Sequence, residues 1–283
     1  MIRVGTRGSA LAVAQARWVG ERLGSPYALV TVSTLGDRGV AGGDKSRWVS
    51  ALERALLEDE IDVAVHSAKD VPAELPEGLS LVAIPARADP RDAICGAPTL
   101  GALAPGARVG TSSLRRAAQI RAARQDLEVV EVRGNVDTRL GKLASGECDA
   151  LVLAAAGLER LGRRDAADGI LDDVVPAAGQ GALALEARPG RVNVDGLVDP
   201  AATACVMAER ELTRALGASC NTPVGAWARI GDGDGDGELE LTAWVGRRDG
   251  SVWISDQARG AAAGLGARVA ERLLAAGAGA LLS

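Results

Sequence analysis

The chain has 283 residues, which is enough for two or three domains with sizeable hydrophobic cores. Its formal net charge of −5 gives no support for nucleic-acid binding, and no stretch approaches the roughly 20 apolar residues that span a membrane. The four widely spaced cysteines form no Cys-x-x-Cys pair, which argues against a zinc site and a disulfide framework. The start of the chain also lacks the layout of a signal peptide. We therefore expect a cytoplasmic protein with no metal, no nucleic-acid partner and no membrane partner.

The first two thirds of the chain alternate short apolar runs with helical patterns, which is typical of βαβ units around a largely parallel sheet. In a first unit we expect strands over 2–6, 27–34 and 61–65, with helices over 11–23 and 47–57. In a second unit we expect strands over 107–110, 129–132 and 150–154, with helices over 113–124 and 136–144. The segments 86–92 and 174–181 are predicted to be two crossovers between these units. Two lobes joined by two crossovers imply a cleft whose walls can hinge.

A smaller α+β region is predicted from about residue 199 onward. It comprises helices over 201–216 and 261–276 and strands near 238–245 and 251–257. The predicted domains are 1–86 with 181–198, then 91–176, and finally 199–283. The alternating Gly and Asp of 231–237 invite a calcium interpretation, but the twelfth loop position, which needs a glutamate, is Ala243. We expect a flexible hairpin tip there instead.

Basic and hydroxyl side chains gather where three predicted strands give way to helices. The runs are Arg7-Gly8-Ser9, Thr111-Ser112-Ser113-Leu114-Arg115-Arg116, and Arg133-Gly134-Asn135 with Arg139 one helical turn later. Helix N-termini and fork-shaped arginines both suit anions, and such junctions face the ligand crevice of an α/β sheet. Each run alone is also compatible with an ordinary helix cap beside solvated arginines. Their threefold occurrence, without a Walker-type glycine loop, predicts a ligand with several carboxylates.

An acidic residue follows another predicted strand, in the run His66-Ser67-Ala68-Lys69-Asp70. Asp70 lies where arginines are expected to gather anions, so it either forms a salt bridge or faces a developing cation on the substrate. At roughly 4 Å and an effective dielectric near 20, the second interaction is worth about 4 kcal/mol. His66, the only histidine of the chain, is more typical of a structural hydrogen bond than of a catalytic group.

Several motifs resemble the porphobilinogen deaminase (hydroxymethylbilane synthase) family, in the same order along the chain. They are Val63-Ala64-Val65-His66-Ser67-Ala68-Lys69-Asp70-Val71-Pro72, Asp89-Pro90-Arg91-Asp92-Ala93, Val109-Gly110 before the Thr111 run, Pro176-Ala177-Ala178-Gly179-Gln180-Gly181, and the loop around Cys220. The resemblance implies an α/β fold of two domains similar to type II periplasmic binding proteins, with a smaller C-terminal α+β domain. It also implies a transferase that joins four porphobilinogen molecules head to tail into hydroxymethylbilane and releases ammonia, in tetrapyrrole (haem and porphyrin) biosynthesis.

The resemblance implies a role for each matching residue. Cys220 would hold a covalent dipyrromethane cofactor, and Asp70 would be the catalytic carboxylate that stabilises an azafulvenium cation. Further contacts to the cofactor would come from Lys69, Asp70, Thr111, Ser112, Ser113, Arg115, Arg116, Arg133, Gly134 and Asn135. Contacts to the substrate would come from Arg7, Ser9, Arg133, Arg139, Arg160 and Gln180. We expect a monomer whose partner is the small molecule porphobilinogen.

The segment 38–48 departs from the family pattern, because it is shorter and Trp48 stands where the family usually has Phe. Its role as a lid stays open. Two other interpretations remain: a non-catalytic two-lobe protein that binds polycarboxylates, and a catalytically dead paralogue. The presence of both Asp70 and Cys220 weighs against the first, and the retention of the recognisable motif residues weighs against the second.

Overall fold

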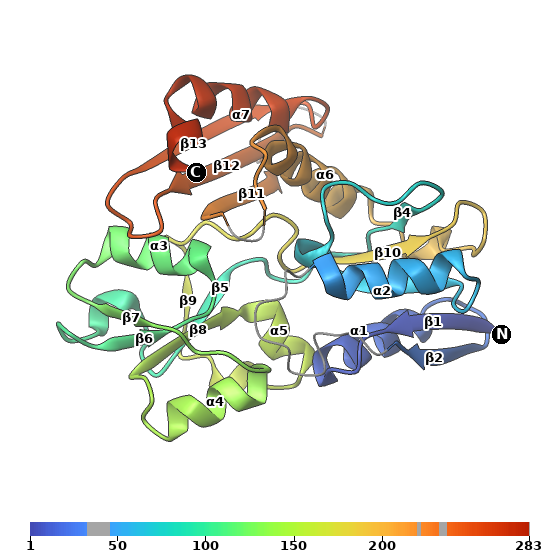
Figure 1. The fold of residues 1–283 in the computed structure, drawn as a ribbon, viewed down its shortest axis with the longest axis horizontal. Coiled ribbons are helices and arrows are strands. Elements are labelled where there is room, and N and C mark those ends of the chain that lie inside the picture. The colour runs from blue at the N-terminus through green and yellow to red at the C-terminus, as the bar shows by residue number, and fades with distance from the viewer. Residues whose placement is uncertain (33–45, 220–221, 232–236, 283) are drawn as a thin grey trace. The chain divides into compact units, whose positions relative to one another are not determined.

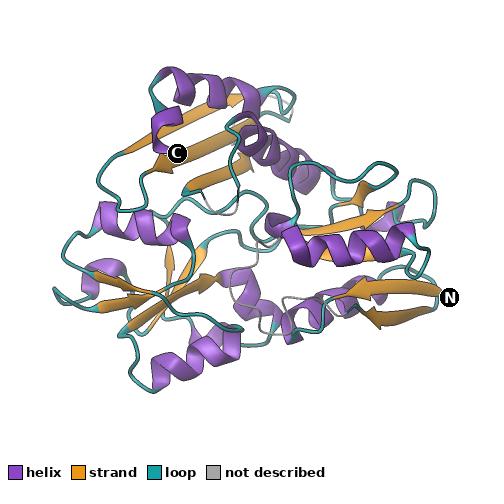
Figure 2. Ribbon diagram, in the orientation of Figure 1, coloured by secondary structure: helices purple, strands orange, loops and turns teal. Residues whose placement is uncertain are grey.

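The computed structural model describes residues 1–32, 46–219, 222–231 and 237–282. The segment 38–45, Cys220 and the run 232–236 lie outside the described residues. The contacts divide the chain into two compact units, which are Met1–Ala88 with Ala182–Val206, and Asp89–Gly181 with Met207–Ser283. Figures 1 and 2 show the elements of both units.

The first unit contains a sheet with the strand order β2-β1-β3-β10-β4 in the described residues. Its strands are β1 (Ile2–Thr6), β2 (Tyr27–Thr31), β3 (Val63–Ser67), β4 (Ser80–Ala83) and β10 (Leu183–Ala187). Its helices are α1 (Ala10–Gly20) and α2 (Ser46–Leu57). β1 runs parallel to β2 and β3, whereas β10 runs antiparallel to β3 and β4. The sheet is therefore mixed.

The two helices of the first unit pack on opposite faces of this sheet. Val63 and Val65 of β3 belong to the hydrophobic cluster that contains Val19 of α1. Ala64, which lies between them, belongs instead to the cluster of Leu52 in α2. Successive side chains of a strand point to opposite faces, so this alternation places one helix on each face. A strand covered on both sides explains why β3 begins with the uninterrupted apolar run Val63-Ala64-Val65.

The second unit repeats this arrangement with the strand order β7-β6-β8-β5-β9 among its described residues. The strands are β5 (Asp92–Cys95), β6 (Arg108–Gly110), β7 (Glu128–Val130), β8 (Ala150–Ala154) and β9 (Gly169–Leu171). The helices are α3 (Leu114–Ala123), α4 (Val136–Ala144) and α5 (Ala155–Arg160). β6 is parallel to β7 and β8, and β5 is antiparallel to β8 and β9. In both sheets the first strand of the parallel set is flanked by the next two.

The rest of the second unit contains an antiparallel sheet with the order β11-β12-β13. Its elements are β11 (Val224–Ile230), β12 (Leu239–Gly246), β13 (Trp253–Gly260) and α7 (Leu265–Ala275), and α6 (Pro200–Ala215) precedes them. Leu239 and Leu241 of β12 are fully buried, as are Leu265 and Leu273 of α7. β11 and β12 pair as a hairpin in which Ile230 faces Leu239. The predicted hairpin tip at 232–236 falls outside the described residues.

The fold class is confirmed: two α/β sheets are joined to a smaller antiparallel sheet with helices. Each sheet is largely parallel as expected, but the single reversed strand in each, β10 or β5, was not predicted. Within the described residues, no helix is long and apolar enough to cross a membrane. The three predicted domain boundaries and the cleft between two lobes stay predictions.

Candidate functional site

The candidate residues of the first unit follow the carboxyl ends of two adjacent strands. β1 ends at Thr6 and is followed by Arg7, and β3 ends at Ser67 and is followed by Lys69 and Asp70. β1 and β3 are parallel partners, so both chain segments leave the sheet on the same side. In open α/β sheets this is the side on which ligands bind. The structure therefore brings Arg7, Lys69 and Asp70 to one end of the first sheet.

Asp70 is carried by a short segment that is fixed from two sides. It lies in a single 3-10 turn, Ala68–Asp70, and is half-buried. The N–H of Ala68 donates to the carbonyl of Ala182, just before β10, at 3.0 Å. The hydroxyl of Ser67 accepts from the side-chain amide of Gln15 in α1 at 3.0 Å. These bonds hold the backbone that leads from β3 into Asp70.

Ser9 marks the start of α1. Its hydroxyl oxygen accepts from the N–H of Ala12 at 3.3 Å, the expected bond of a helix N-cap. The hydroxyl proton remains able to donate to a ligand, since a serine hydroxyl has one donor and two acceptor positions. The structure thus shows the capping role of Ser9, and the predicted substrate contact stays a prediction.

His66 belongs to a buried cluster of ionisable groups. Its Nε2 lies 3.0 Å from Oε2 of Glu186 in β10, and both side chains are almost completely buried. Burial raises the pKa of the nearby Glu53 carboxyl, and Glu186 raises it further, whereas His66 opposes the shift. The single histidine is therefore held close to a buried carboxylate, and its structural role stays a prediction.

The candidate residues of the second unit also follow the carboxyl ends of parallel strands, here β6, β7 and β8. Ser113 caps α3 by accepting from the N–H of Arg116 at 3.5 Å, and Thr111 Oγ1 accepts from the N–H of Ser113 at 3.1 Å. Asn135 caps α4 by accepting from the N–H of Thr138 at 2.8 Å. The φ of Gly134 is 123°, a value that favours glycine, so this residue lets the chain turn into the cap. Ser112 between the two capping groups is half-buried.

Arg115 and Arg116 are buried and share one carboxylate. Nη2 of Arg115 lies 2.8 Å from Oδ2 of Asp92, and Nη2 of Arg116 lies 2.7 Å from Oδ1 of the same side chain. Gln180, almost completely buried, donates from Nε2 to Oδ1 of Asp92 at 2.7 Å and to the carbonyl of Pro90 at 2.6 Å. Both arginines therefore have a structural partner that the sequence analysis did not foresee.

This cluster holds one more positive charge than negative charge. Burial opposes ionisation of Asp92, yet Arg115 and Arg116 outweigh it and hold the pKa of that carboxyl well below its usual range. Burial lowers the pKa of Arg115, Asp92 counteracts this, and the like charge of Arg116 lowers it again. The Nε atoms of both arginines are buried and have no hydrogen-bond partner in the described part of the chain. The cluster is thus suited to a further anion.

Arg139 of α4 lies close to this cluster, but unlike Arg115 and Arg116 it has no carboxylate partner among the described residues. Its Nε donates to the carbonyl of Gly134 at 2.7 Å, and no ion pair of Arg139 occurs among the described residues. Burial lowers the pKa of Arg139, and the neighbouring charges of Arg116 and Arg133 lower it further. Arg133 itself is exposed and bonds Glu131 at 2.8 Å. The surroundings of Arg139 therefore favour a negatively charged ligand.

Arg160, at the end of α5, is half-buried and donates from Nη2 to the carbonyl of Gly181 at 2.6 Å. Burial lowers the pKa of Arg160. This bond joins the end of α5 to the crossover that also contains Gln180. The side-chain amide of Gln180 donates to Asp92 and Pro90, and the predicted contact of Gln180 with substrate stays a prediction.

The four cysteines include three buried thiols besides Cys220. Cys220 lies outside the described residues. Among its described neighbours, the N–H of Ser219 donates to the hydroxyl of Thr222 at 2.8 Å. Cys95, Cys148 and Cys205 are free thiols and buried. Burial, aided by Asp168, raises the pKa of Cys95 to about 11, which makes that thiol a poor nucleophile at neutral pH.

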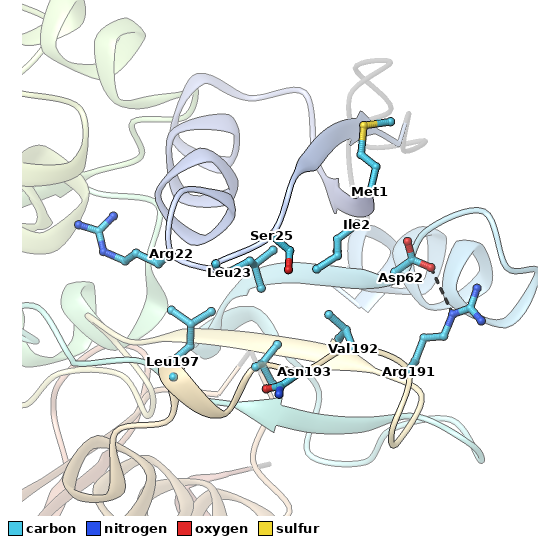
Figure 3. Close-up of a pocket in the computed structure, with 13 residues that line it drawn as sticks. Met1, Ile2, Arg22, Leu23, Ser25, Asp62, Arg191, Val192, Asn193 and Leu197 are labelled. Carbon is cyan, nitrogen blue, oxygen red and sulfur yellow. Dashed lines mark hydrogen bonds and ion pairs between the residues drawn. The ribbon is translucent and has the colours of Figure 1, made fainter.

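A hollow of about 640 Å³ lies in the first unit, away from all these residues (Figure 3). It is lined by Met1 at the start of β1, by Ser25 before β2 and by Asp62 before β3. These are the amino ends of the parallel strands, opposite to the end that carries Asp70. Nε of Arg191 lies 3.2 Å from Asp62 Oδ1 beside the hollow. We therefore do not assign the candidate site to this hollow.

The described residues contain no group of His, Cys, Asp and Glu suited to a metal ion.

The fold and the site define a class of two-sheet α/β proteins with arginines, whose guanidinium groups suit carboxylates, at the carboxyl ends of their parallel strands. Comparison with known proteins identifies the member of this class. The family model for the "porphobilinogen deaminase, dipyromethane cofactor binding domain" matches residues 2–195, and the one for the "porphobilinogen deaminase, C-terminal domain" matches residues 203–275.

Individual relatives agree with the family models over nearly the whole chain. The porphobilinogen deaminase of Deinococcus deserti is 46% identical over 307 residues, which cover 99% of this chain and 97% of that protein. The one of Thermus thermophilus is 50% identical over 243 residues, covering 81% of each. Among solved structures, the periplasmic VFT2 domain of Bordetella pertussis BvgS has a TM-score of 0.39 and 17% identity, covering 67% of this chain and 81% of that one.

The chain belongs to the porphobilinogen deaminase family. It is a transferase of tetrapyrrole biosynthesis that makes hydroxymethylbilane from porphobilinogen, and it uses a dipyrromethane cofactor. The residues present fit this cofactor, whose pyrrole rings carry acetate and propionate groups. The arginine cluster of the second unit has an excess positive charge and two unpartnered buried N–H groups within the described chain, as a carboxylate ligand requires.

Proposed function

We propose that Asp70 is the catalytic carboxylate of this enzyme, that Cys220 carries the cofactor, and that the arginines at the strand ends bind the acetate and propionate groups. The observation that carries this proposal is the repeated placement of these residues. In both sheets, basic side chains follow the carboxyl ends of the parallel strands, and in the first sheet the acid Asp70 lies at the same end as Arg7 and Lys69.

The arginines divide between two tasks in this proposal. Arg115, Arg116 and Arg133, together with Lys69, Thr111, Ser112, Ser113, Gly134 and Asn135, contact the cofactor. Arg7, Ser9, Arg133, Arg139, Arg160 and Gln180 contact porphobilinogen units as they are added. Each porphobilinogen brings two carboxylates, so neutralising the growing product requires more than one arginine. Fork-shaped guanidinium groups suit this task, because they bind carboxylates with two parallel hydrogen bonds.

Asp70 acts on the opposite charge. Loss of ammonia from porphobilinogen leaves a cationic pyrrole, and a carboxylate at roughly 4 Å stabilises such a charge by about 4 kcal/mol at an effective dielectric near 20. That amount corresponds to a rate enhancement of about a thousandfold. Arginines alone would disfavour this cation, so the site needs one acidic group beside them.

Cys220 is supported as the attachment residue by the chemistry of the other thiols. Cys95, Cys148 and Cys205 are buried, and burial raises the pKa of both Cys95 and Cys148. A raised pKa leaves little thiolate, which is the nucleophilic form. The dipyrromethane, once attached, supplies the primer to which porphobilinogen units are added.

We also propose that the protein acts as a cytoplasmic monomer. The described thiols form no disulfide, which suits a reducing compartment.

The experiment for Asp70 combines a rate with a mass. Asp70→Asn should fold and carry its cofactor but lose most turnover, by about a thousandfold. Glu74→Gln, an exposed acid four residues further on, is the matched control and should keep the normal rate. The intact mass of each variant must accompany its assay, since cofactor assembly uses the same chemistry. A near-normal rate in cofactor-bearing Asp70→Asn would exclude this role.

A further inference from the structure

Asp92 occupies an unusual place in the second unit. It begins β5, its backbone faces Ala154 of β8 and Leu171 of β9, and none of its surface is exposed. Its two carboxylate oxygens accept from separate groups: Oδ2 accepts from Arg115 at 2.8 Å, and Oδ1 accepts from Arg116 at 2.7 Å. A carboxylate fixed in an interior strand of the sheet thus joins the two arginines at the start of α3.

Each guanidinium is also tied to a backbone carbonyl. Nη1 of Arg115 donates to Val175 at 2.8 Å, and Nη1 of Arg116 donates to Val152 at 3.2 Å. A guanidinium has five N–H groups. Within the described chain, Arg115 uses two of these groups in hydrogen bonds and Arg116 uses three, so donors remain on both for a ligand. The hydrogen bonds therefore fix the planes of both guanidinium groups before a ligand binds, and each group still has N–H donors for that ligand.

We propose that Asp92 is a positioning residue that holds Arg115 and Arg116 as a preformed pair for one carboxylate of the cofactor. Two adjacent cations in a buried position repel each other, and Asp92 offsets this repulsion while it sets their orientation. Because it neutralises one of the two charges, the pair retains a single positive charge. That charge matches a single carboxylate. This inference rests on the proposed function, in which both arginines contact the cofactor.

The first test is the fraction of molecules that carry the cofactor, measured by intact mass on the full chain. Asp92→Asn keeps the shape of the side chain but removes its charge, and we expect the cofactor-bearing fraction to fall at least tenfold. Asp89→Asn is the matched control, because Asp89 also bonds an arginine, Arg91, at 2.7 Å in the same segment. It should keep the wild-type fraction. A wild-type fraction in Asp92→Asn would overturn the proposal.

Asp92→Asn leaves two buried cations without their carboxylate, so it can fail to fold. Asp92→Glu then decides, because it keeps the charge and moves the carboxylate by one methylene. If Asp92 positions the arginines, Asp92→Glu should melt within a few degrees of wild type yet show at least a tenfold lower cofactor-bearing fraction or a tenfold higher KM for porphobilinogen. Wild-type values of both in folded Asp92→Glu would overturn the proposal.

The proposed function fails in a distinguishable way. If Arg115→Leu and Arg116→Leu both retain the cofactor, the arginines do not bind it, and the assignment of the site is wrong at that point. If both lose the cofactor while the folded Asp92 variants keep it, the arginines bind as proposed and only the role of Asp92 is wrong.

Discussion

Arg139 should contribute to function at a cost to stability, and Arg139→Gln separates the two. The half-buried guanidinium has no ion pair among the described residues, and Arg116 and Arg133 repel it. Its replacement loses the hydrogen bond to Gly134, worth about 1 kcal/mol, and relieves desolvation and repulsion of similar size. The unfolding free energy should therefore change by less than about 1 kcal/mol, which is a shift in Tm of at most about 2–4 °C.

The effect of Arg139→Gln on activity should be much larger. A charge-assisted hydrogen bond to a substrate carboxylate is worth about 2–3 kcal/mol, so kcat/KM should fall by about 30- to 150-fold. Steady-state kinetics and thermal melting on the same preparation measure both quantities. Lys142→Gln, in the same helix and paired with Glu147, is the control and should leave both unchanged. A fall in Tm beyond 5 °C, or a normal kcat/KM, would refute the assignment.

Three further predictions concern the other groups described above. Burial raises the pKa of Glu53, so the stability that this carboxyl contributes is present below the ordinary carboxyl pKa and is lost as the pH rises through the raised value. Glu53→Gln cannot titrate at this position, so its unfolding free energy should fall less than that of wild type between pH 4 and pH 8. An unchanged pH profile of stability would contradict this. With a pKa of about 11, only about one Cys95 thiol in a thousand is ionised at pH 8, so native iodoacetamide treatment followed by peptide mapping should leave Cys95 unlabelled, and rapid labelling would show that the thiol is accessible. Arg7→Leu should form the holoenzyme but block the incoming porphobilinogen, whereas Arg116→Leu should impair cofactor assembly; identical ladders of enzyme–substrate complexes in native mass spectrometry would show that this division is wrong.

The sequence predicted best those elements whose signal is local. β8 and α4 have the expected bounds, because a continuous apolar run and a capped amphipathic pattern identify them without reference to the rest of the chain. β5 and β10 were missed as strands. Both are fully buried, so they show no alternation, and their partners lie far away in the sequence, as with Asp92 beside Leu171. Their antiparallel direction depends on these distant contacts.

The same distinction applies to the site. The position of Arg7, Asp70 and Arg133 at strand ends follows from the order of strands and helices, which the sequence predicts. The shared carboxylate of Asp92 does not, because it lies 23 residues from Arg115 and 24 from Arg116 and begins a strand that was interpreted as a polar crossover. Only the sheet brings these side chains together. The motif Asp89-Pro90-Arg91-Asp92-Ala93 drew attention to Asp92 in the sequence, but it gave no sign of the two arginines that Asp92 contacts.

The attachment of the cofactor to Cys220 is tested most directly by the intact mass of the purified protein. The account predicts that the wild-type mass exceeds the sequence mass by two porphobilinogen units less two ammonia molecules, and that the excess persists through turnover because water does not readily cleave a thioether. Cys220→Ser should lack the adduct and be inactive, while Cys205→Ser should keep it. An adduct that remains in Cys220→Ser, or that maps to another cysteine, would contradict the assignment.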